Sequence, residues 1–156
     1  MLATSFPRFE AIAEQFSMLP EGEERLKFLV QLGRKLPLLD DSEQVEKNLV
    51  RGCVSSVWLI CERTTEDDES SQRLTLSFRG RSDAQIVSGL VAIVLSRYSG
   101  MSPEAILSVK TTSILDGFGL QAHLSPGRRI GLSAMVARIR QFALEAVVSE
   151  GESDER

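Results

Sequence analysis

Apolar residues recur at helical spacing in the first quarter of the chain. The first predicted helix ends before Pro20 and carries the apolar set Phe9, Ile12, Phe16 and Leu19. A second runs from about residue 23 to Pro37, which ends it, with Leu26, Leu29, Val30 and Leu36 on one face. An acidic stretch, residues 40–46, then leads into sequence of a different kind.

The middle of the chain changes to a period of two. Residues 54–60 are rich in β-branched and aromatic side chains, and residues 74–79 alternate between apolar and polar ones. Residues 64–72 lie between them with four acids and two serines, which predicts a solvated hairpin loop. A short strand around residues 48–50 is expected to add a third member to an antiparallel sheet.

Helical patterns return in the second half. Ser82 stands three residues before Gln85, a capping-box spacing, and the helix it opens is apolar on nearly every side to about Tyr98, so we expect it at the centre of the fold. Ser-Pro pairs at 102–103 and 125–126 predict the starts of a short helix and of a long last one. Residues 6–148 are therefore predicted to form a single α+β domain, a small antiparallel sheet of about three strands flanked by helices, and residues 149–156 a disordered acidic tail.

Composition narrows the classes of function. The 156 residues suit one domain, and a formal net charge of −4 argues against a nucleic-acid partner. The longest apolar run, residues 90–95, is too short to cross a bilayer, and the N-terminus lacks the pattern of a secretory signal, so we expect no membrane association. Two cysteines, not in a CxxC pair, favour free thiols in a reducing, cytoplasmic compartment.

Cys53 is the strongest candidate for chemistry. It follows Arg51 and Gly52 where an irregular segment meets a strand, and the glycine permits an unusual backbone angle. Its thiolate would be a strong nucleophile, and Arg51 and Lys47 are near enough in sequence to stabilise the anion. From the residues alone, however, we favour the other interpretation, that Cys53 is a small buried apolar side chain, as free cysteines usually are.

The other polar candidates suggest less chemistry. Cys61 shares strand parity with Val57 and Leu59, which predicts a packing role. His123 is the only histidine and has no acid or nucleophile at motif spacing, so we expect neither a metal site nor a catalytic triad. No phosphate-binding glycine motif occurs either.

Four segments, taken together, resemble the SufE-type sulfur acceptors (the SufE/CsdE family, with an Fe-S metabolism associated domain). They are residues 32–37 (LGRKLP), 51–58 (RGCVSSVW), 78–90 (FRGRSDAQIVSGL) and 123–128 (HLSPGR) followed by Gly131 and Leu132. The segments occur in the family's order and the resemblance spans roughly residues 6–145. Each motif is weak alone, but the set is specific.

The resemblance implies a fold like that of IscU-type scaffolds and a function in sulfur transfer. Cys53 coincides with the persulfide-carrying cysteine, with Arg51 and Gly52 in its loop, while Asp83 and Arg128 take positions near that loop or the partner surface. The implied partners are a pyridoxal-phosphate-dependent cysteine desulfurase, SufS-like or CsdA-like, and iron–sulfur scaffold proteins. The pyridoxal phosphate belongs to the desulfurase, so this chain is expected to need no cofactor of its own. We also expect it to show no catalysis without its partner.

Three alternatives stay open. One is a binding module that stimulates the desulfurase without carrying sulfur, and another is a paralogue in a different sulfur-transfer pathway. A scaffold that assembles a cluster itself would need several thiolate ligands, and Cys61 is the only other cysteine.

Overall fold

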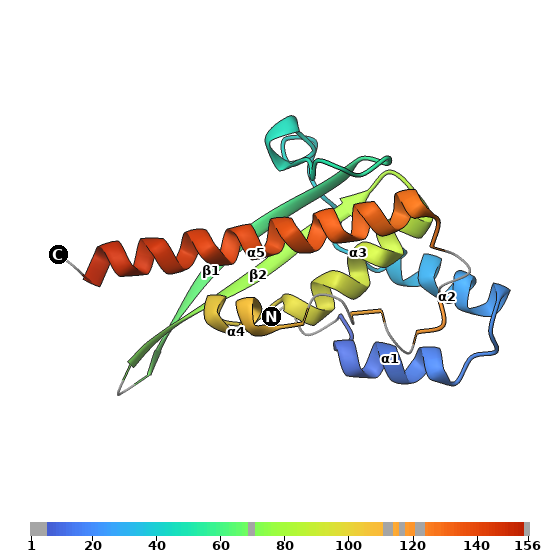
Figure 1. Ribbon diagram of the computed structural model, residues 1–156, viewed down its shortest axis with the longest axis horizontal. Helices are drawn as coiled ribbons and strands as arrows, with labels where there is room; N and C mark the ends of the chain where they lie inside the picture. Colours follow the sequence, from blue (N-terminus) through green and yellow to red (C-terminus); the bar gives the residue numbers. More distant parts are fainter. Residues whose placement is uncertain (1–5, 69–70, 111–113, 116–117, 121–123, 155–156) are drawn as a thin grey trace.

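The computed structural model describes residues 6–68, 71–110, 114–115, 118–120 and 124–154. Two helices precede a β-hairpin, and further helices follow it (Figure 1). The elements are α1 (Phe9–Ser17), α2 (Glu23–Arg34), the 3₁₀ turn η2 (Glu46–Asn48), β1 (Val57–Asp68), β2 (Ser71–Ser82), α3 (Gln85–Tyr98), α4 (Pro103–Ser108) and α5 (Pro126–Asp154). The predicted α+β class, a small antiparallel sheet with flanking helices, is confirmed.

The sheet differs from prediction in its number of strands. Within the described residues it has two strands, paired antiparallel from Val57 opposite Ser82 to Asp68 opposite Ser71. The third strand predicted around residues 48–50 is wrong, because Glu46–Asn48 wind into a 3₁₀ turn. What remains of it is one isolated bridge between Leu49 and Trp58, beside a hydrogen bond from the Val50 amide to the Val57 carbonyl (2.8 Å).

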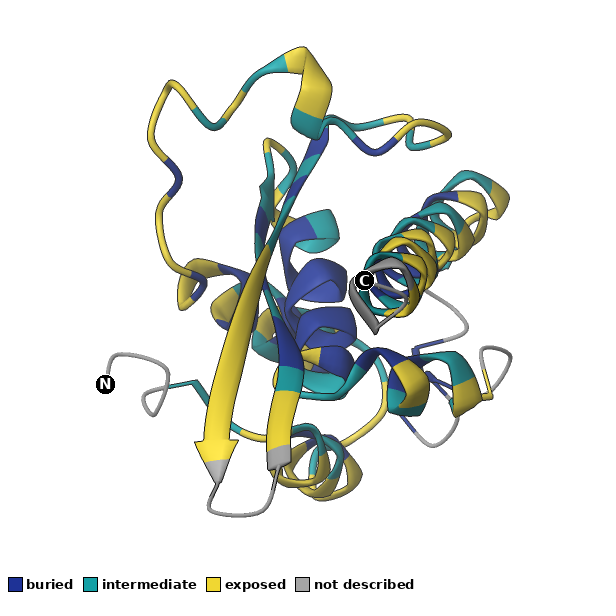
Figure 2. Cartoon of the chain, turned by 90° about the vertical axis from the view of Figure 1, so that its left-hand side faces the viewer, coloured by how far each residue is buried: buried dark blue, intermediate teal, exposed yellow. Residues whose placement is uncertain are grey.

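The hairpin extends well beyond the body of the molecule. Both strands run through most of the segment predicted to be a loop, and residues 62–67 of β1 are exposed (Figure 2). Strand is favoured there by the adjacent threonines at 64 and 65 and by a cross-strand pair of opposite charge, Glu66 opposite Arg73. The charged arm of the hairpin is therefore formed by pairing between the two strands, although its composition is typical of a loop.

The helix α3 forms the centre of the fold, as predicted. Its residues 88–95 are all buried, and it lies between the hairpin and α5 (Figure 2). A pair of glycines lets α2 approach it closely: a Cβ added at Gly89 would stand 2.3 Å from the Leu29 carbonyl oxygen, and one at Gly33 would stand 2.7 Å from the Gly89 nitrogen. Any larger side chain at these two positions would push the helices apart.

The last helix begins where the Ser-Pro pair predicts. The Arg128 and Arg129 amides donate to the Oγ (3.3 Å) and carbonyl (3.0 Å) of Ser125, which closes the first turn. Its inner face packs into the core through Met135, Val136, Ile139, Ala143 and Ala146. The helix continues to Asp154, so residues 149–154 of the predicted tail are helical; Gly151, a single glycine, is too weak a breaker to stop it.

Candidate functional site

Cys53 lies in a short loop, residues 51–55, that is fixed at its base and protrudes at its tip. The Val50–Val57 hydrogen bond closes the base on one side. On the other side Ser56 is held by the end of β2: its carbonyl accepts from the Asp83 amide (3.2 Å) and from the Ser82 hydroxyl (2.7 Å). A loop anchored in this way can shift its tip without disturbing the sheet.

Gly52 gives the loop its turn. Its φ is +100°, in the region that L side chains rarely adopt, so the unusual backbone angle expected there is present. A Cβ at this position would also stand 3.3 Å from the Cβ of Ala134 on α5. The glycine thus serves both the backbone conformation and the close approach of the loop to α5.

The Cys53 side chain is half-buried against the first turns of α5. Its thiol donates to the Gly131 carbonyl oxygen, with an Sγ–O distance of 3.5 Å. A Cβ added at Gly131 would meet the Cys53 sulfur at 3.4 Å, so α5 has a glycine where the thiol rests. Burial raises the pKa of the Cys53 thiol, and the resting group is therefore the protonated, poorly nucleophilic form.

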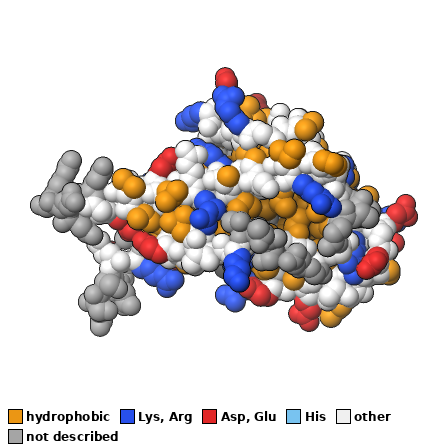
Figure 3. Space-filling model, in the orientation of Figure 1, with side chains coloured by type: hydrophobic (Ala, Val, Ile, Leu, Met, Phe, Trp, Pro, Cys, Tyr) orange, Lys and Arg blue, Asp and Glu red, His pale blue; other side chains and the backbone are white. Residues whose placement is uncertain are grey.

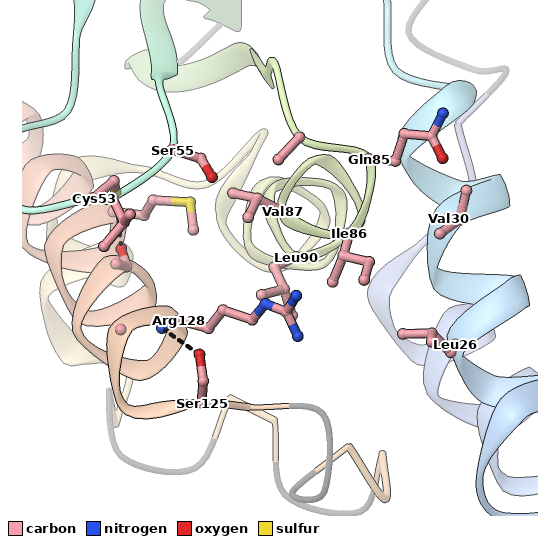
Figure 4. A pocket seen from close by; sticks show the side chains of 15 residues that line it. Leu26, Val30, Cys53, Ser55, Gln85, Ile86, Val87, Leu90, Ser125 and Arg128 are labelled. Carbon is pink, nitrogen blue, oxygen red and sulfur yellow. Dashed lines mark hydrogen bonds between the residues drawn. The ribbon is translucent and has the colours of Figure 1, made fainter.

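A cavity of about 610 Å³ opens beside the Cys53 loop, between α2, α3 and the start of α5 (Figure 4). Its walls are mainly apolar and come from segments far apart in sequence. They include Leu26 and Val30 of α2, Ile86, Val87 and Leu90 of α3, and Met135 of α5. Cys53, Val54 and Ser55 form one side, and Val54 is 90% exposed although it is apolar.

Among the described residues that line this cavity, Arg128 is the charged one. It lies on the first turn of α5, and its side chain extends from that helix toward Leu90 and Ile86 (Figure 4). A guanidinium in a mostly apolar cavity, on the same helix as the carbonyl that holds the Cys53 thiol, is well placed to meet an anion brought there. The structure therefore brings Arg128 and Cys53 to one cavity.

Asp83 acts on the loop through Ser56. Its Oδ1 accepts a hydrogen bond from the Ser56 amide at 3.1 Å, and its own amide donates back to the Ser56 carbonyl. The predicted capping box is not formed: the N-cap of α3 is Ala84, which has no side-chain cap, and the Ser82 hydroxyl accepts from the Ala84 amide instead (3.2 Å). Asp83 is thus a support for the base of the cysteine loop.

Arg51 turns away from the sulfur. Its guanidinium pairs with Glu46 at 3.4 Å, and both side chains are more than three-quarters exposed. Lys47 and Arg51 line a separate groove and are absent from the cavity beside Cys53. The hypothesis that these cations stabilise the Cys53 thiolate gains no support, since burial is the cause that moves the Cys53 pKa.

Cys61 occupies the position predicted for it in β1, opposite Phe78. Burial is the largest influence on its thiol and raises the pKa to about 11. Within the described part of the chain no cluster of three or more His, Cys, Asp or Glu side chains is suited to a metal ion, and no helix is long and apolar enough to span a membrane. His123 lies outside the described residues.

Several residues of the site were given no role from the sequence. Gly131 and Ser56 lie within the motifs that carry the family resemblance, so a signal was present, but their contacts with Cys53 and Asp83 join segments distant in the chain. The apolar walls on α2 and α3 gave no signal of their own, because cavity residues and core residues show the same helical spacing.

Comparison with known proteins gives one consistent result. The family model for SufE, described as an Fe-S metabolism associated domain, matches residues 10–143. An uncharacterized SufE-like protein of Rhizobium meliloti is 37% identical over 134 residues, which is 86% of this chain and 93% of that protein. Another from Rhizobium etli is 40% identical over 134 residues, covering 86% of this chain and 88% of the relative.

Proposed function

The chain belongs to the SufE family, whose domain is associated with Fe-S metabolism, and from this we propose that it accepts sulfur from a cysteine desulfurase as a persulfide on Cys53. The observation that carries the proposal is the placement of Cys53: a lone thiol at the tip of an anchored loop, beside an apolar cavity. The sulfur would pass on to iron–sulfur cluster assembly in the reducing cytoplasm. The donor is a pyridoxal-phosphate enzyme, SufS-like or CsdA-like, whose cofactor generates its persulfide.

The proposed step is thiol–persulfide exchange. Cys53 loses its proton, and the thiolate attacks the outer sulfur of the donor's persulfide. A new S–S bond forms at Cys53 while the donor's S–S bond breaks, and the donor's sulfur leaves as a thiolate that takes up a proton. One sulfur atom moves between two thiols, so no external oxidant or reductant is required.

The site chemistry suits a carrier at rest. The raised pKa keeps Cys53 protonated, and the contact with Gly131 holds it against α5, which limits reaction with stray electrophiles. The apolar walls would exclude water and small reductants from a bound outer sulfur. Arg128 supplies a positive charge in the cavity that favours an anionic perthiolate.

Mass spectrometry tests the proposal directly. The protein is incubated with a SufS-type desulfurase, pyridoxal phosphate and cysteine, and its intact mass is measured with and without a thiol reductant. We expect one added sulfur that maps to Cys53 and is removed by the reductant. A Cys53→Ser variant should gain no sulfur and lose stimulation of the desulfurase; stimulation that survives intact would favour the non-carrying binding module.

A further inference from the structure

A second groove, of about 490 Å³, lies on the other side of the Cys53 loop. It runs between the segment 46–51 and α5. Its floor on α5 is made by small side chains, Ala134 and Ala137, and Gln141 offers a side-chain amide at the same wall. A floor of this kind lets the backbone of another chain approach α5 closely.

The walls of the groove are positively charged. Lys47, Arg51 and Arg138 line it, and Glu46 is the one acid among its described lining residues. The groove therefore carries a net charge of about +2, in a chain whose formal net charge is −4. Figure 3 shows blue side chains over the η2 region on the face that α5 presents.

Both walls are held in place. Arg138 lies over the ring of Phe142, with its Cζ 3.9 Å from the ring centroid. On the opposite wall, Glu43 just before η2 accepts two hydrogen bonds from Arg79 of β2, and the adjacent carboxylate of Glu62 binds the same guanidinium. Arg138 is thus held in place, and the segment that carries Lys47 and Arg51 is anchored next to η2 through Glu43, which lowers the entropy cost of binding.

The groove lies within the footprint of a partner of standard interface size that is centred on Cys53. Gly131, which holds the thiol, and Arg138 are seven residues apart on α5, or about 10 Å along the helix. One side of a standard protein interface covers about 800 Å², equivalent to a disc of roughly 16 Å radius. A partner centred on Cys53 would therefore cover the groove as well as the apolar cavity.

We propose that this groove receives an acidic segment of the persulfide donor. The inference rests on the proposed function and adds to it a docking surface and the charge that the donor must present there. Carboxylates of the donor pair with Lys47, Arg51 and Arg138, and its backbone lies over Ala134 and Ala137. Since Glu46 already pairs with Arg51, it competes with the incoming acids.

Charge reversal tests the groove at residues that do not support the fold. Lys47 and Arg51 are both exposed, so a Lys47→Glu/Arg51→Glu variant should keep its melting temperature. The matched control is Arg63→Glu/Lys110→Glu, which makes the same change in net charge at two exposed positions outside the groove. The measurement is the concentration of each variant that half-maximally stimulates a SufS-type desulfurase, at low and at high salt.

We expect the groove variant to raise the half-saturating concentration by roughly tenfold at low salt, with the rate at saturation unchanged. High salt should reduce this difference, and the matched control should resemble wild type. Glu46→Gln should act in the opposite direction and lower the half-saturating concentration a few-fold, an outcome that damage to the fold would not produce.

Two results would overturn the inference while leaving the proposed function in place: sulfur on Cys53 with unchanged half-saturation in the groove variant, or a loss confined to the rate at saturation. Sedimentation of the protein alone tests the other possible occupant of the groove, a second copy of this chain. A dimer that the groove variant abolishes would assign the groove to a second copy of this chain. Absence of sulfur on wild-type Cys53 would instead remove the proposed function, and this inference with it.

Discussion

Replacing Gly52 by alanine should release the tip of the Cys53 loop, because the backbone strain it adds exceeds the energy of the contact that holds the tip. With φ at +100°, an alanine would be strained by about 1–2 kcal/mol, and its Cβ would also press on Ala134 at 3.3 Å. The tip of the loop is held by the thiol contact between Cys53 and Gly131, a weak sulfur hydrogen bond worth at most about 1 kcal/mol. Since the strain is larger than the energy of this hydrogen bond, we expect the tip of the loop to move off α5.

The displaced loop should have a more reactive thiol. Moving Cys53 out of its half-buried place removes the burial that raises its pKa, so the thiolate fraction at neutral pH rises. The assay is the rate of Cys53 alkylation by iodoacetamide, with Cys61→Ala as the common background. We expect an increase of a few-fold in Gly52→Ala, because the alkylation rate follows the thiolate fraction and access.

Gly22 provides the matched control. It has the same φ of +100° but nothing within 4 Å of an added Cβ, and it lies at the start of α2. Gly22→Ala should lower the melting temperature by about 2–8 °C, as 1–2 kcal/mol does in a domain of this size, and leave alkylation unchanged. Gly52→Ala should lose no more stability than this, since its strain can relax. Equal alkylation in both variants and wild type would show that the loop conformation does not depend on Gly52.

Four further outcomes follow from the structure. Alkylation of Cys53 in the free protein should rise with pH around a midpoint above that of an unstructured cysteine, since burial raises its pKa; a midpoint at or below the ordinary value would contradict the burial argument. Cys61→Ala should keep sulfur transfer and lose about 1 kcal/mol of stability. The pKa of Cys61 is higher in the folded protein (about 11) than in the unfolded chain (9.0), so the protonated thiol stabilises the fold fully below pH 9 and this contribution is lost as the pH rises toward 11. The melting temperature of Cys61→Ala should therefore fall less between pH 9 and 11 than that of the wild type. Asp83→Ala should cost about 1 kcal/mol by removing the acceptor for the Ser56 amide, whereas Asp83→Asn should retain most of that bond, and thermal melts distinguish the two. Arg128→Ala should reduce sulfur uptake or desulfurase affinity more than it lowers the melting temperature, and normal values of both would remove Arg128 from the site.

The sequence predicted those parts of the fold that depend on local pattern. The buried α3 and the start of α5 at Ser125-Pro126 follow from periodicity and capping, and both are present. The extended hairpin and the missing third strand were not predicted, because acidic residues in 66–69 look like a loop and residues 48–50 look like a strand when pairing partners are unknown. Strand formation depends on what lies opposite, and that information is not local.

The site shows the same difference between features set by local sequence and contacts made by distant segments. Cys53 and Gly52 were identified from a short motif, whereas the environment of the thiol was not. Arg51 is two residues away in sequence, which favoured a stabilised thiolate, yet its side chain pairs with Glu46. The group that contacts the sulfur is the carbonyl of Gly131, 78 positions along the chain. Closeness in sequence along an irregular segment says little about where a side chain points, so the direction of the Cys53 pKa required the fold.

These facts together bear on how a thiol with a raised pKa can serve as an acceptor. If a fixed cation beside Cys53 activated it, the free protein would be reactive at all times, and its persulfide equally open to loss. Instead the thiol is kept protonated by burial and is held in place by one weak contact, while the base of its loop is fixed by Val50, Ser56 and Asp83. The energy needed to release the tip is small compared with what a docked interface supplies, since a single well-formed charge pair already matches it. Under the proposed function, docking of the donor would both uncover Cys53 and raise its thiolate fraction, so that reactivity appears only where the donor's persulfide is present.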